Sequence, residues 1–270
     1  MRQLPPLNRV LTRLQILLSD TNSSLDDVAE LIRLDAAMTT RIIHVSNSAW
    51  FGRGGPCHTI AEAVNRIGFR EVYYVVAVTA AKAVVAQPLA AYGRNANALW
   101  RESIACAFGA DLIAQRIGED PAVAYMAGLL HGVGRVAINH YLTTSGARTS
   151  PLVDDGFPVD FSAAEVAVLG FDQAAVGACM LEKWAFDAAI VEPVRHQYDP
   201  LAAGDLHDRM AAALCGARLL RTAACAPAAV CKPEEVEDVF GVLRLEAGEV
   251  LALLPDVQRQ VSRSLEMLGA

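Results

Sequence analysis

The sequence predicts an all-α protein, a two-lobed helical bundle, and three observations support this fold class. Apolar residues recur at positions i, i+3, i+4 and i+7, the spacing of a helix with one buried face. Ser, Thr and Asp residues stand just before many of these segments, where they can cap a helix N-terminus. Alanine, the strongest helix former, is frequent, and the alternation typical of β-strands is missing.

The expected N-terminal lobe comprises residues 1–90. Its first helix begins after Pro5 and Pro6, because proline is tolerated in the first turn of a helix. Ser23 and Ser24 are each followed three residues later by an aspartate, so they offer two overlapping capping boxes for a second helix. The later helices of this lobe are expected at about 36–46, at 60–68 behind a capping box of Thr59 and Glu62, and at 69–86.

The expected C-terminal lobe comprises residues 91–270. Asp120 followed by Pro121 marks a helix N-terminus, with a capping carboxylate and a proline in the first turn. Ser162 and Glu165 have the spacing of another capping box, after a loop at about 143–158. Further helices are expected at about 98–117, 173–184 with Asp172 as its cap, 187–197, 205–224, 234–241, 246–254 and 256–267.

Composition narrows the classes of partner. The chain has 270 residues, a net charge of −7 and no dense run of Lys and Arg, which argues against a nucleic-acid partner. The longest apolar stretch, residues 72–86, is broken by Lys82 and is too short to span a membrane. Residues 1–20 form an amphipathic pattern rather than a signal peptide. Six cysteines without a CxxC pair predict neither disulfides nor a zinc cluster. We therefore expect a cytoplasmic protein without a membrane partner.

The most informative segment is residues 124–135, AYMAGLLHGVGR. His131 follows an apolar helical run, and a turn with Gly132 and Gly134 then precedes the basic residue Arg135. This segment resembles the signature turn of the HD superfamily of metal-dependent phosphohydrolases, in which an adjacent His-Asp pair holds a divalent metal. The aspartate position is occupied by Gly132, which has no side-chain oxygen to offer a hard cation.

Further segments of the sequence allow a more specific resemblance to be identified. In order, they are Leu4–Leu7, Asp35–Thr39, Asn47–Ala49 with Phe51-Gly52, Ala63-Val64 through Ile67-Gly68, Leu99–Arg101 with Ser103, and Gly128–Arg135. Their order and spacing are similar to those of the HDOD family, the HD-related output domains of bacterial signalling proteins. The resemblance covers roughly residues 3–200. It implies an all-helical HD-like fold and a role in signal transduction.

The resemblance also indicates where metal ligands would lie. The corresponding positions fall on or near Glu102, His131, Gly132, Gln173, Gln197-Tyr198 and Ala212–Gly216. Of the candidate donors, His131, Glu102 and an offset His196 remain, without the bridging carboxylate that hydrolysis requires. These are interpreted as vestigial positions, so no catalytic residue, metal or cofactor is predicted. His131 is expected to hydrogen-bond to backbone or water, and Glu102 to be solvated or locally paired.

Asn47, Ser48, Trp50 and Phe51 lie in a second segment that matches the family. One interpretation is structural: Asn47 and Ser48 bond to local backbone while the two aromatic residues fill a lobe junction. The other interpretation is a partner-facing patch, because aromatic residues often anchor interfaces.

Three hypotheses about function follow. The first is a non-enzymatic regulatory module that binds a protein of a signalling pathway or a small effector such as a signalling nucleotide. With no receiver-like segment before Leu4, it would be a stand-alone protein or a piece of a longer one. The second is a divergent phosphohydrolase acting on nucleotides or cyclic dinucleotides through an altered metal site. The third is a helical scaffold that only docks or forms a homodimer.

Overall fold

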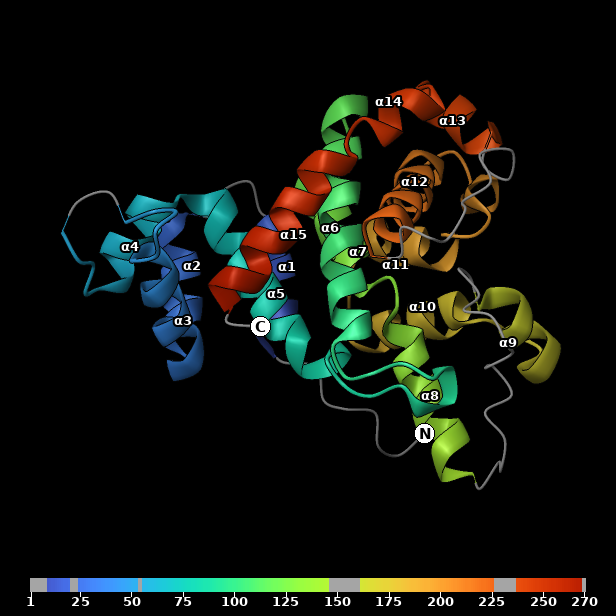
Figure 1. The fold of residues 1–270 in the computed structure, drawn as a ribbon, viewed down its shortest axis with the longest axis horizontal. Coiled ribbons are helices and arrows are strands. Elements are labelled where there is room, and N and C mark those ends of the chain that lie inside the picture. The colour runs from blue at the N-terminus through green and yellow to red at the C-terminus, as the bar shows by residue number, and fades with distance from the viewer. Residues whose placement is uncertain (1–8, 20–23, 53–54, 146–160, 226–236, 269–270) are drawn as a thin grey trace. The chain divides into compact units, whose positions relative to one another are not determined.

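The computed structural model describes residues 9–19, 24–52, 55–145, 161–225 and 237–268. Within these ranges the named elements are all helices, and no β-strand is present apart from an isolated bridge between Leu89 and Arg94. The all-α class predicted from the sequence is therefore confirmed. Figure 1 shows the helices in chain order.

The chain divides into two compact units. The N-terminal unit comprises Pro6–Ala83 together with Ser262–Ala270, and the central unit contains Val84–Val261. The division after Ala83 lies near the expected boundary at residue 90, but the C-terminal segment belongs to the N-terminal unit. Sequence patterns predict helices and turns, but the unit to which the C-terminal segment belongs is decided by long-range packing.

The N-terminal unit is built from helices whose ends are fixed by local side chains. Its elements are α1 (Arg9–Ser19), α2 (Leu25–Arg33), α3 (Ala36–Ser46), α4 (Ile60–Ile67), most of α5 (Phe69–Val85) and the end of α15 (Leu254–Leu268). Ser24 Oγ accepts a hydrogen bond from the amide of Asp27, and Asp27 Oδ2 accepts one from the amide of Ser24. Thr59 and Glu62 form the same reciprocal box at α4. Both capping predictions are confirmed, while Pro5, Pro6 and Ser23 lie outside the described residues.

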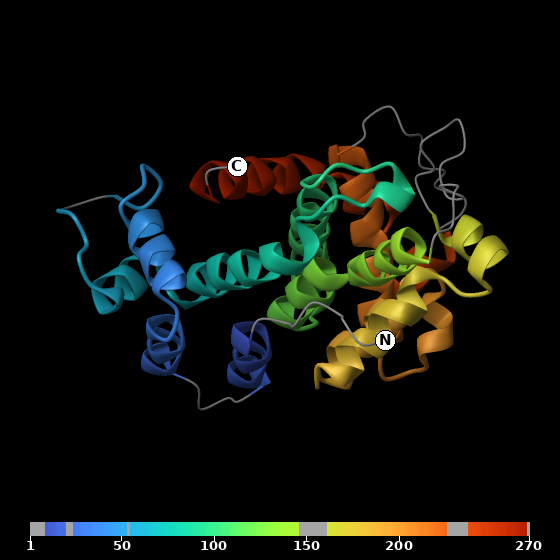
Figure 2. The ribbon, with the colours of Figure 1, turned by 90° about the horizontal axis from the view of Figure 1, so that it is seen from below.

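The central unit carries the HD-like segment. Its elements are η1 (Ala90–Tyr92), α6 (Ala98–Ile117), α7 (Pro121–Leu130), α8 (Val133–Thr144), α9 (Ser162–Leu169), α10 (Gln173–Lys183), α11 (Ala188–Arg195), η2 (Pro200–Ala203), α12 (Asp208–Cys225), α13 (Glu237–Leu243), α14 (Ala247–Leu251) and the start of α15. Helix α6 packs against both α7 and α12, and α8 packs against α10. Figure 2 shows the same elements from below.

Two glycines permit close helix packing around the turn between α7 and α8. A Cβ atom on Gly128 would lie 2.7 Å from the Ala107 Cα of α6. A Cβ atom on Gly134 would lie 1.9 Å from the carbonyl oxygen of Gln173 at the start of α10. Side chains do not fit at either position, so the turn that carries His131 is held against α6 and α10 by backbone contact.

The stretch Pro121–Thr144 is long and apolar enough to cross a membrane on length and composition, with a break at His131 and Gly132. However, 78% of its most apolar window is buried inside the protein. This burial is that of a core helix pair, and it explains the apolar composition without a membrane.

The capping box expected from Ser162 and Glu165 is wrong. Phe161 precedes α9 without a side-chain cap, and Ser162 Oγ donates to Asp172 Oδ2 at 3.1 Å. Glu165 is fully buried and accepts hydrogen bonds from Tyr92 and from the amide of Gln173. Glu165 therefore bonds to Tyr92 and Gln173, which are distant in sequence, and does not cap α9. The predicted loop 143–158 lies largely outside the described residues, and α8 continues through Thr144.

Candidate functional site

His131 lies at the C-terminal end of α7 and is completely buried. Its Nδ1 is 2.8 Å from the carbonyl oxygen of Gly128, and its Nε2 is 3.1 Å from Nη1 of Arg221. A guanidinium can only donate, so Nε2 accepts and Nδ1 carries the proton. Burial lowers the pKa of His131 well below its ordinary value, and the positive charges of Arg221 and Arg135 lower it further. The ring is therefore neutral, with both nitrogens engaged.

Glu102 on α6 is paired with three arginines. Its Oε1 lies 3.1 Å from Arg94 Nη2. Its Oε2 lies 3.4 Å from Arg135 Nη1 and 3.9 Å from Arg221 Nη1. The residue is 8% exposed, so the arginines stand in for the water that a carboxylate otherwise needs. Glu102 is thus a locally paired acid rather than a solvated one.

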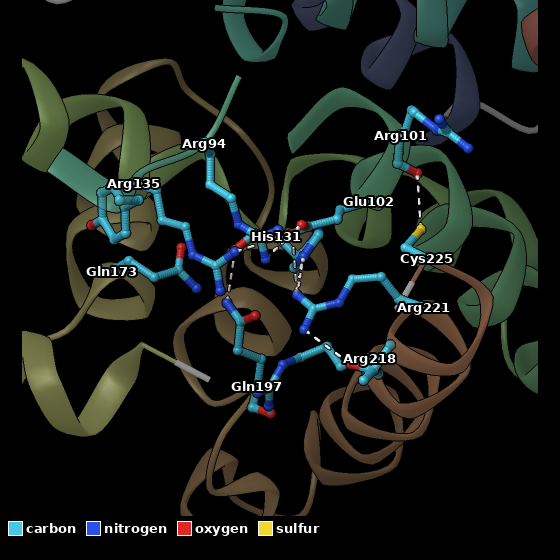
Figure 3. A network of polar contacts seen from close by, with 12 residues as sticks. Arg94, Arg101, Glu102, His131, Arg135, Gln173, Gln197, Arg218, Arg221 and Cys225 are labelled. Carbon is cyan, nitrogen blue, oxygen red and sulfur yellow. Dashed lines mark hydrogen bonds and ion pairs between the residues drawn. The ribbon is translucent and has the colours of Figure 1, made fainter. Parts of the chain in front are cut away.

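Arg218 approaches the site from α12, one helical turn before Arg221. Its Nη1 donates to the carbonyl oxygen of Gln197 at 2.7 Å, and its guanidinium lies 3.9 Å from the centre of the Tyr198 ring. Gln197 Nε2 in turn donates to the carbonyl oxygen of His131 at 2.9 Å. The segment after α11 is therefore tied to the His131 turn (Figure 3).

Phe161 provides an aromatic platform for two of the arginines. The guanidinium carbons of Arg94 and Arg135 lie 5.8 Å and 5.5 Å from the centre of its ring. The ring also meets Tyr92 edge-on at 5.1 Å. These distances are within the range of a cation–π contact. We call Arg94, Arg135, Arg218 and Arg221 the arginine cluster.

A buried carboxylate, Glu165, borders the arginine cluster. Its Oε1 accepts a hydrogen bond of 2.8 Å from Tyr92 Oη, and its Oε2 accepts one of 2.6 Å from the amide of Gln173. Burial raises the pKa of Glu165, and the positive charge of Arg135 opposes this shift. The Gln173 side chain is itself fully buried and donates through Nε2 to Tyr198 Oη at 3.0 Å.

The residues around His131 do not fit a divalent cation. Among the described residues, no group of three or more His, Cys, Asp or Glu side chains is placed to hold a metal. The Nε2 lone pair that would bind a cation faces Arg221, which carries positive charge itself. A Cβ atom on Gly132 would lie 2.5 Å from Cδ1 of Leu99, so an aspartate at this position would require the Leu99 side chain to move.

His196 lies apart from this arrangement. Its Nε2 is 3.5 Å from Oε2 of Glu192, four residues earlier on α11, and the side chain is partly exposed. The neighbouring Gln197 makes the contact with His131 instead. Of the positions interpreted as vestigial, the structure therefore brings together Glu102, His131 and Gly132.

The segment from Asn47 to Phe51 is separate and belongs to the N-terminal unit. Asn47 bridges the backbone of Cys57, donating to its carbonyl oxygen at 2.9 Å and accepting from its amide at 2.7 Å. Trp50 is 49% exposed, and Arg263 of α15 lies 5.4 Å from its ring and 4.8 Å from that of Phe51. Ser48 Oγ is buried and has no hydrogen-bond partner among the described residues. The side-chain amide of Asn47 therefore has a structural role, whereas the Trp50 ring is open to solvent.

Sequence reasoning missed the arginine cluster. Arg94, Arg135 and the pair Arg218 and Arg221 are far apart in sequence, and they lie in no run of positive charge. One signal was present: Arg218 and Arg221 are three residues apart, hence on one face of α12, and the residues from Met210 to Ala217 before them are apolar.

Comparisons with known proteins match the greater part of the chain. A family model described as HDOD domain matches residues 4–200. A relative from Treponema pallidum (strain Nichols), described as an uncharacterized protein, is 25% identical over 199 residues. The match covers 73% of this chain but 38% of that relative, so the chain spans well under half of the relative's length.

Solved structures share the fold. An HDOD domain protein of unknown function from Geobacter sulfurreducens is 21% identical, with a TM-score of 0.73 over 98% of this chain and 93% of that one. A candidate signal transduction protein from Marinobacter aquaeolei VT8 is 21% identical, with a TM-score of 0.74 over 98% of this chain and 59% of that one. A candidate phosphohydrolase from Shewanella amazonensis SB2B is 22% identical, with a TM-score of 0.71 over 98% and 95% of the two chains.

Proposed function

The chain belongs to the HDOD domain family, and we propose that it is a non-enzymatic regulatory module of bacterial signal transduction. It acts by binding a protein partner or a small effector rather than by turning over a substrate. The signalling role rests on the family, since a fold by itself does not define a function. The non-enzymatic character rests on the chemistry of the site.

One observation carries the proposal: the guanidinium of Arg221 stands at Nε2 of His131. A metal-dependent hydrolase needs that lone pair for a cation that activates water. A cation placed there would meet the positive charge of Arg221 at close range, with Glu102 already shared among three arginines. Nε2 is the basic nitrogen of this tautomer, and its lone pair already accepts from a guanidinium that cannot release a proton, so the ring is also unsuited to act as a base.

The test combines metal content with turnover. The purified protein is equilibrated with Mn²⁺, Mg²⁺ or Zn²⁺, passed through a desalting column and analysed for bound metal. It is then assayed against a panel of nucleotides and cyclic dinucleotides. The proposal expects substoichiometric metal and no hydrolysis.

The alternative, a divergent phosphohydrolase, expects the opposite outcome. It requires bound metal together with turnover that is lost in both His131→Ala and Glu102→Ala. Turnover of that kind would overturn the proposal. A contaminating hydrolase is recognised because its activity survives both substitutions.

A homodimer is part of the proposal as one form of protein partner. Light scattering over a range of protein concentrations measures it directly. A mass that rises with concentration supports self-association, whereas a constant monomer mass leaves a different protein or a small effector as the ligand.

A further inference from the structure

We propose that the arginine cluster is a binding site for the phosphoryl group of a small molecule. This inference rests on the proposed function and deepens it, because it names the chemical class of the effector.

Three guanidinium groups, those of Arg94, Arg135 and Arg221, converge on Glu102, and the fourth, that of Arg218, lies one helical turn before Arg221. Arg94 follows η1, Arg135 lies on α8, and Arg218 and Arg221 lie on α12. Glu102 is within ion-pairing distance of three of them (Figure 3). In a protein whose net charge is −7, this concentration of cationic N–H donors creates a local positive field. Guanidinium groups match the geometry of phosphate oxygens, which they can bind in pairs of hydrogen bonds.

The arginine cluster reaches the protein surface at two of its members. The side chain of Arg94 is 25% exposed and Arg218 is also partly exposed, whereas Arg135 and Arg221 are buried. The cluster therefore extends from the surface to the buried His131 ring. An anion that enters at Arg94 or Arg218 leaves bulk water and meets charges that are screened less than surface charges.

Aromatic rings lie close to three of the guanidinium groups. The guanidinium carbons of Arg94 and Arg135 lie within 6 Å of the centre of the Phe161 ring, and that of Arg218 lies 3.9 Å from the centre of the Tyr198 ring. The shorter distance is that of stacking, which engages the flat face of the Arg218 guanidinium and leaves its edge for hydrogen bonds. The Arg218 donors are thus oriented before a ligand arrives, which reduces the entropy lost on binding.

A second observation points to the identity of the ligand. Gln173 Oε1 and Gln197 Oε1 are buried and have no hydrogen-bond partner among the described residues. Both side chains are fully buried, and Figure 3 shows them directed toward the arginine cluster. Unsatisfied buried acceptors call for a donor. Inorganic phosphate, or a phosphate monoester that retains one proton, presents anionic oxygens to the arginines and a hydroxyl to a glutamine. Sulfate has a similar shape and charge but no such hydroxyl.

The competing explanation is purely internal. The arginines would then serve only to neutralise Glu102 and Glu165, and ordered water would satisfy the glutamine oxygens. This explanation predicts no saturable response to phosphate.

The experiment is a titration of the full chain with inorganic phosphate, sulfate and chloride in EDTA at constant ionic strength, followed by thermal unfolding and calorimetry. We expect phosphate to bind saturably, to raise the Tm and to bind more tightly than sulfate, with no effect of chloride. Arg94→Gln and Arg218→Gln should each weaken phosphate binding by about tenfold or more, the loss expected for one charge-assisted hydrogen bond.

Arg259→Gln is the matched control. Arg259 is paired with Asp256 on α15, its side chain is 68% exposed, and it lies outside the arginine cluster. The variant removes the same charge and should bind phosphate as the wild type does. Circular dichroism of all variants identifies any that fail to fold, and Arg218→Lys, which keeps the charge, should retain part of the affinity.

Three results would overturn the inference: no saturable phosphate response, an equal response in Arg94→Gln, Arg218→Gln and Arg259→Gln, or sulfate binding as tight as phosphate. These results differ from failure of the proposed function. Metal-dependent hydrolysis would contradict the non-enzymatic module, whereas a metal-free protein that ignores phosphate contradicts the phosphoryl site alone.

Discussion

Arg221 Nη1 lies 3.1 Å from His131 Nε2, where a metal-dependent hydrolase would hold its cation. The hydrogen bond from Nδ1 to Gly128 fixes the tautomer, so the lone pair of Nε2 faces the guanidinium. An arginine differs from a bound metal in an important way: it cannot be removed by a chelator and it does not activate water. The positive charge beside His131 Nε2 therefore belongs to a side chain of the protein and not to a bound ion.

The first prediction concerns the stability that Arg221 supplies. Arg221→Met should lower the free energy of unfolding by about 1–3 kcal/mol, because it leaves His131 Nε2 buried without its donor. Glu102 keeps its ion pairs with Arg94 and Arg135, which limits the loss. Urea denaturation measures this loss. Adding Glu102→Gln to the same chain should increase it, since Arg94 and the buried Arg135 then lose the carboxylate with which they pair. A loss below about 1 kcal/mol would show that the contact contributes little.

The second prediction concerns pH. The folded-state pKa of His131 lies below the unfolded value of about 6.5, so below that pH the unfolded chain binds a proton that the folded chain does not. The stability supplied by His131 is complete above pH 6.5 and declines as the pH falls. Its slope is at most about 1.4 kcal/mol per pH unit. His131→Asn should remove this slope from unfolding curves between pH 6.5 and 5. An unchanged slope would mean that other groups cause the pH dependence.

The third prediction concerns the missing aspartate. Gly132→Asp should not create a metal site, because Leu99 occupies the space beside the new Cβ atom and Arg221 remains at His131. We expect a loss of about 1–3 kcal/mol from overpacking and no Mn²⁺ binding by calorimetry. Gly132→Ala separates the steric effect from that of the carboxylate. One equivalent of bound Mn²⁺ in Gly132→Asp would contradict the account of this turn.

The fourth prediction compares two glycines. Gly134→Ala should cost more than about 3 kcal/mol, because the added Cβ atom would lie 1.9 Å from the backbone oxygen of Gln173. Gly241→Ala, inside α13, has no atom within 4 Å of its added Cβ and should instead stabilise the protein by about 0.5–1 kcal/mol. Thermal unfolding distinguishes the two. Equal effects would show that α8 and α10 do not approach as closely as the structure has them.

The fifth prediction separates the two interpretations of the segment at Asn47. Asn47→Ala should destabilise the protein by about 1–3 kcal/mol, because both hydrogen bonds to Cys57 are lost. Trp50→Ala should cost about 1 kcal/mol or less, the value of an exposed cation–π contact with Arg263. A larger loss in Trp50→Ala than in Asn47→Ala would make the aromatic side chain the structural element and Asn47 the dispensable one.

Local chemistry was sufficient to predict much of the fold. Ranges 36–46 and 98–117 coincide with α3 and α6, and Asp120, Thr59 and Ser24 cap the helices that they were expected to cap. These signals act within one turn of the chain, so neighbouring residues contain the necessary information. Glu165 shows the limit: its spacing from Ser162 is correct for a cap, yet Tyr92 and Gln173 bind it.

The site could be predicted only in part. The absence of an aspartate at Gly132 is visible in the sequence, and so is the acid at Glu102. The residues around them are not visible in the same way, because the packing of α12 against α6 brings Arg221 to Glu102. Spacing in the chain does not reveal this contact. Charge runs indicate surface patches, whereas a buried cluster is assembled from single residues.

The most direct test of the central claim is the ¹⁵N NMR spectrum of the His131 ring during a titration with Mn²⁺. The account predicts an Nδ1–H tautomer with an accepting Nε2, unchanged between pH 6 and 8, and no paramagnetic broadening at one equivalent of the metal. Stoichiometric broadening of the His131 signals, removed by EDTA, would contradict it, because Nε2 would then bind a metal in place of the guanidinium of Arg221.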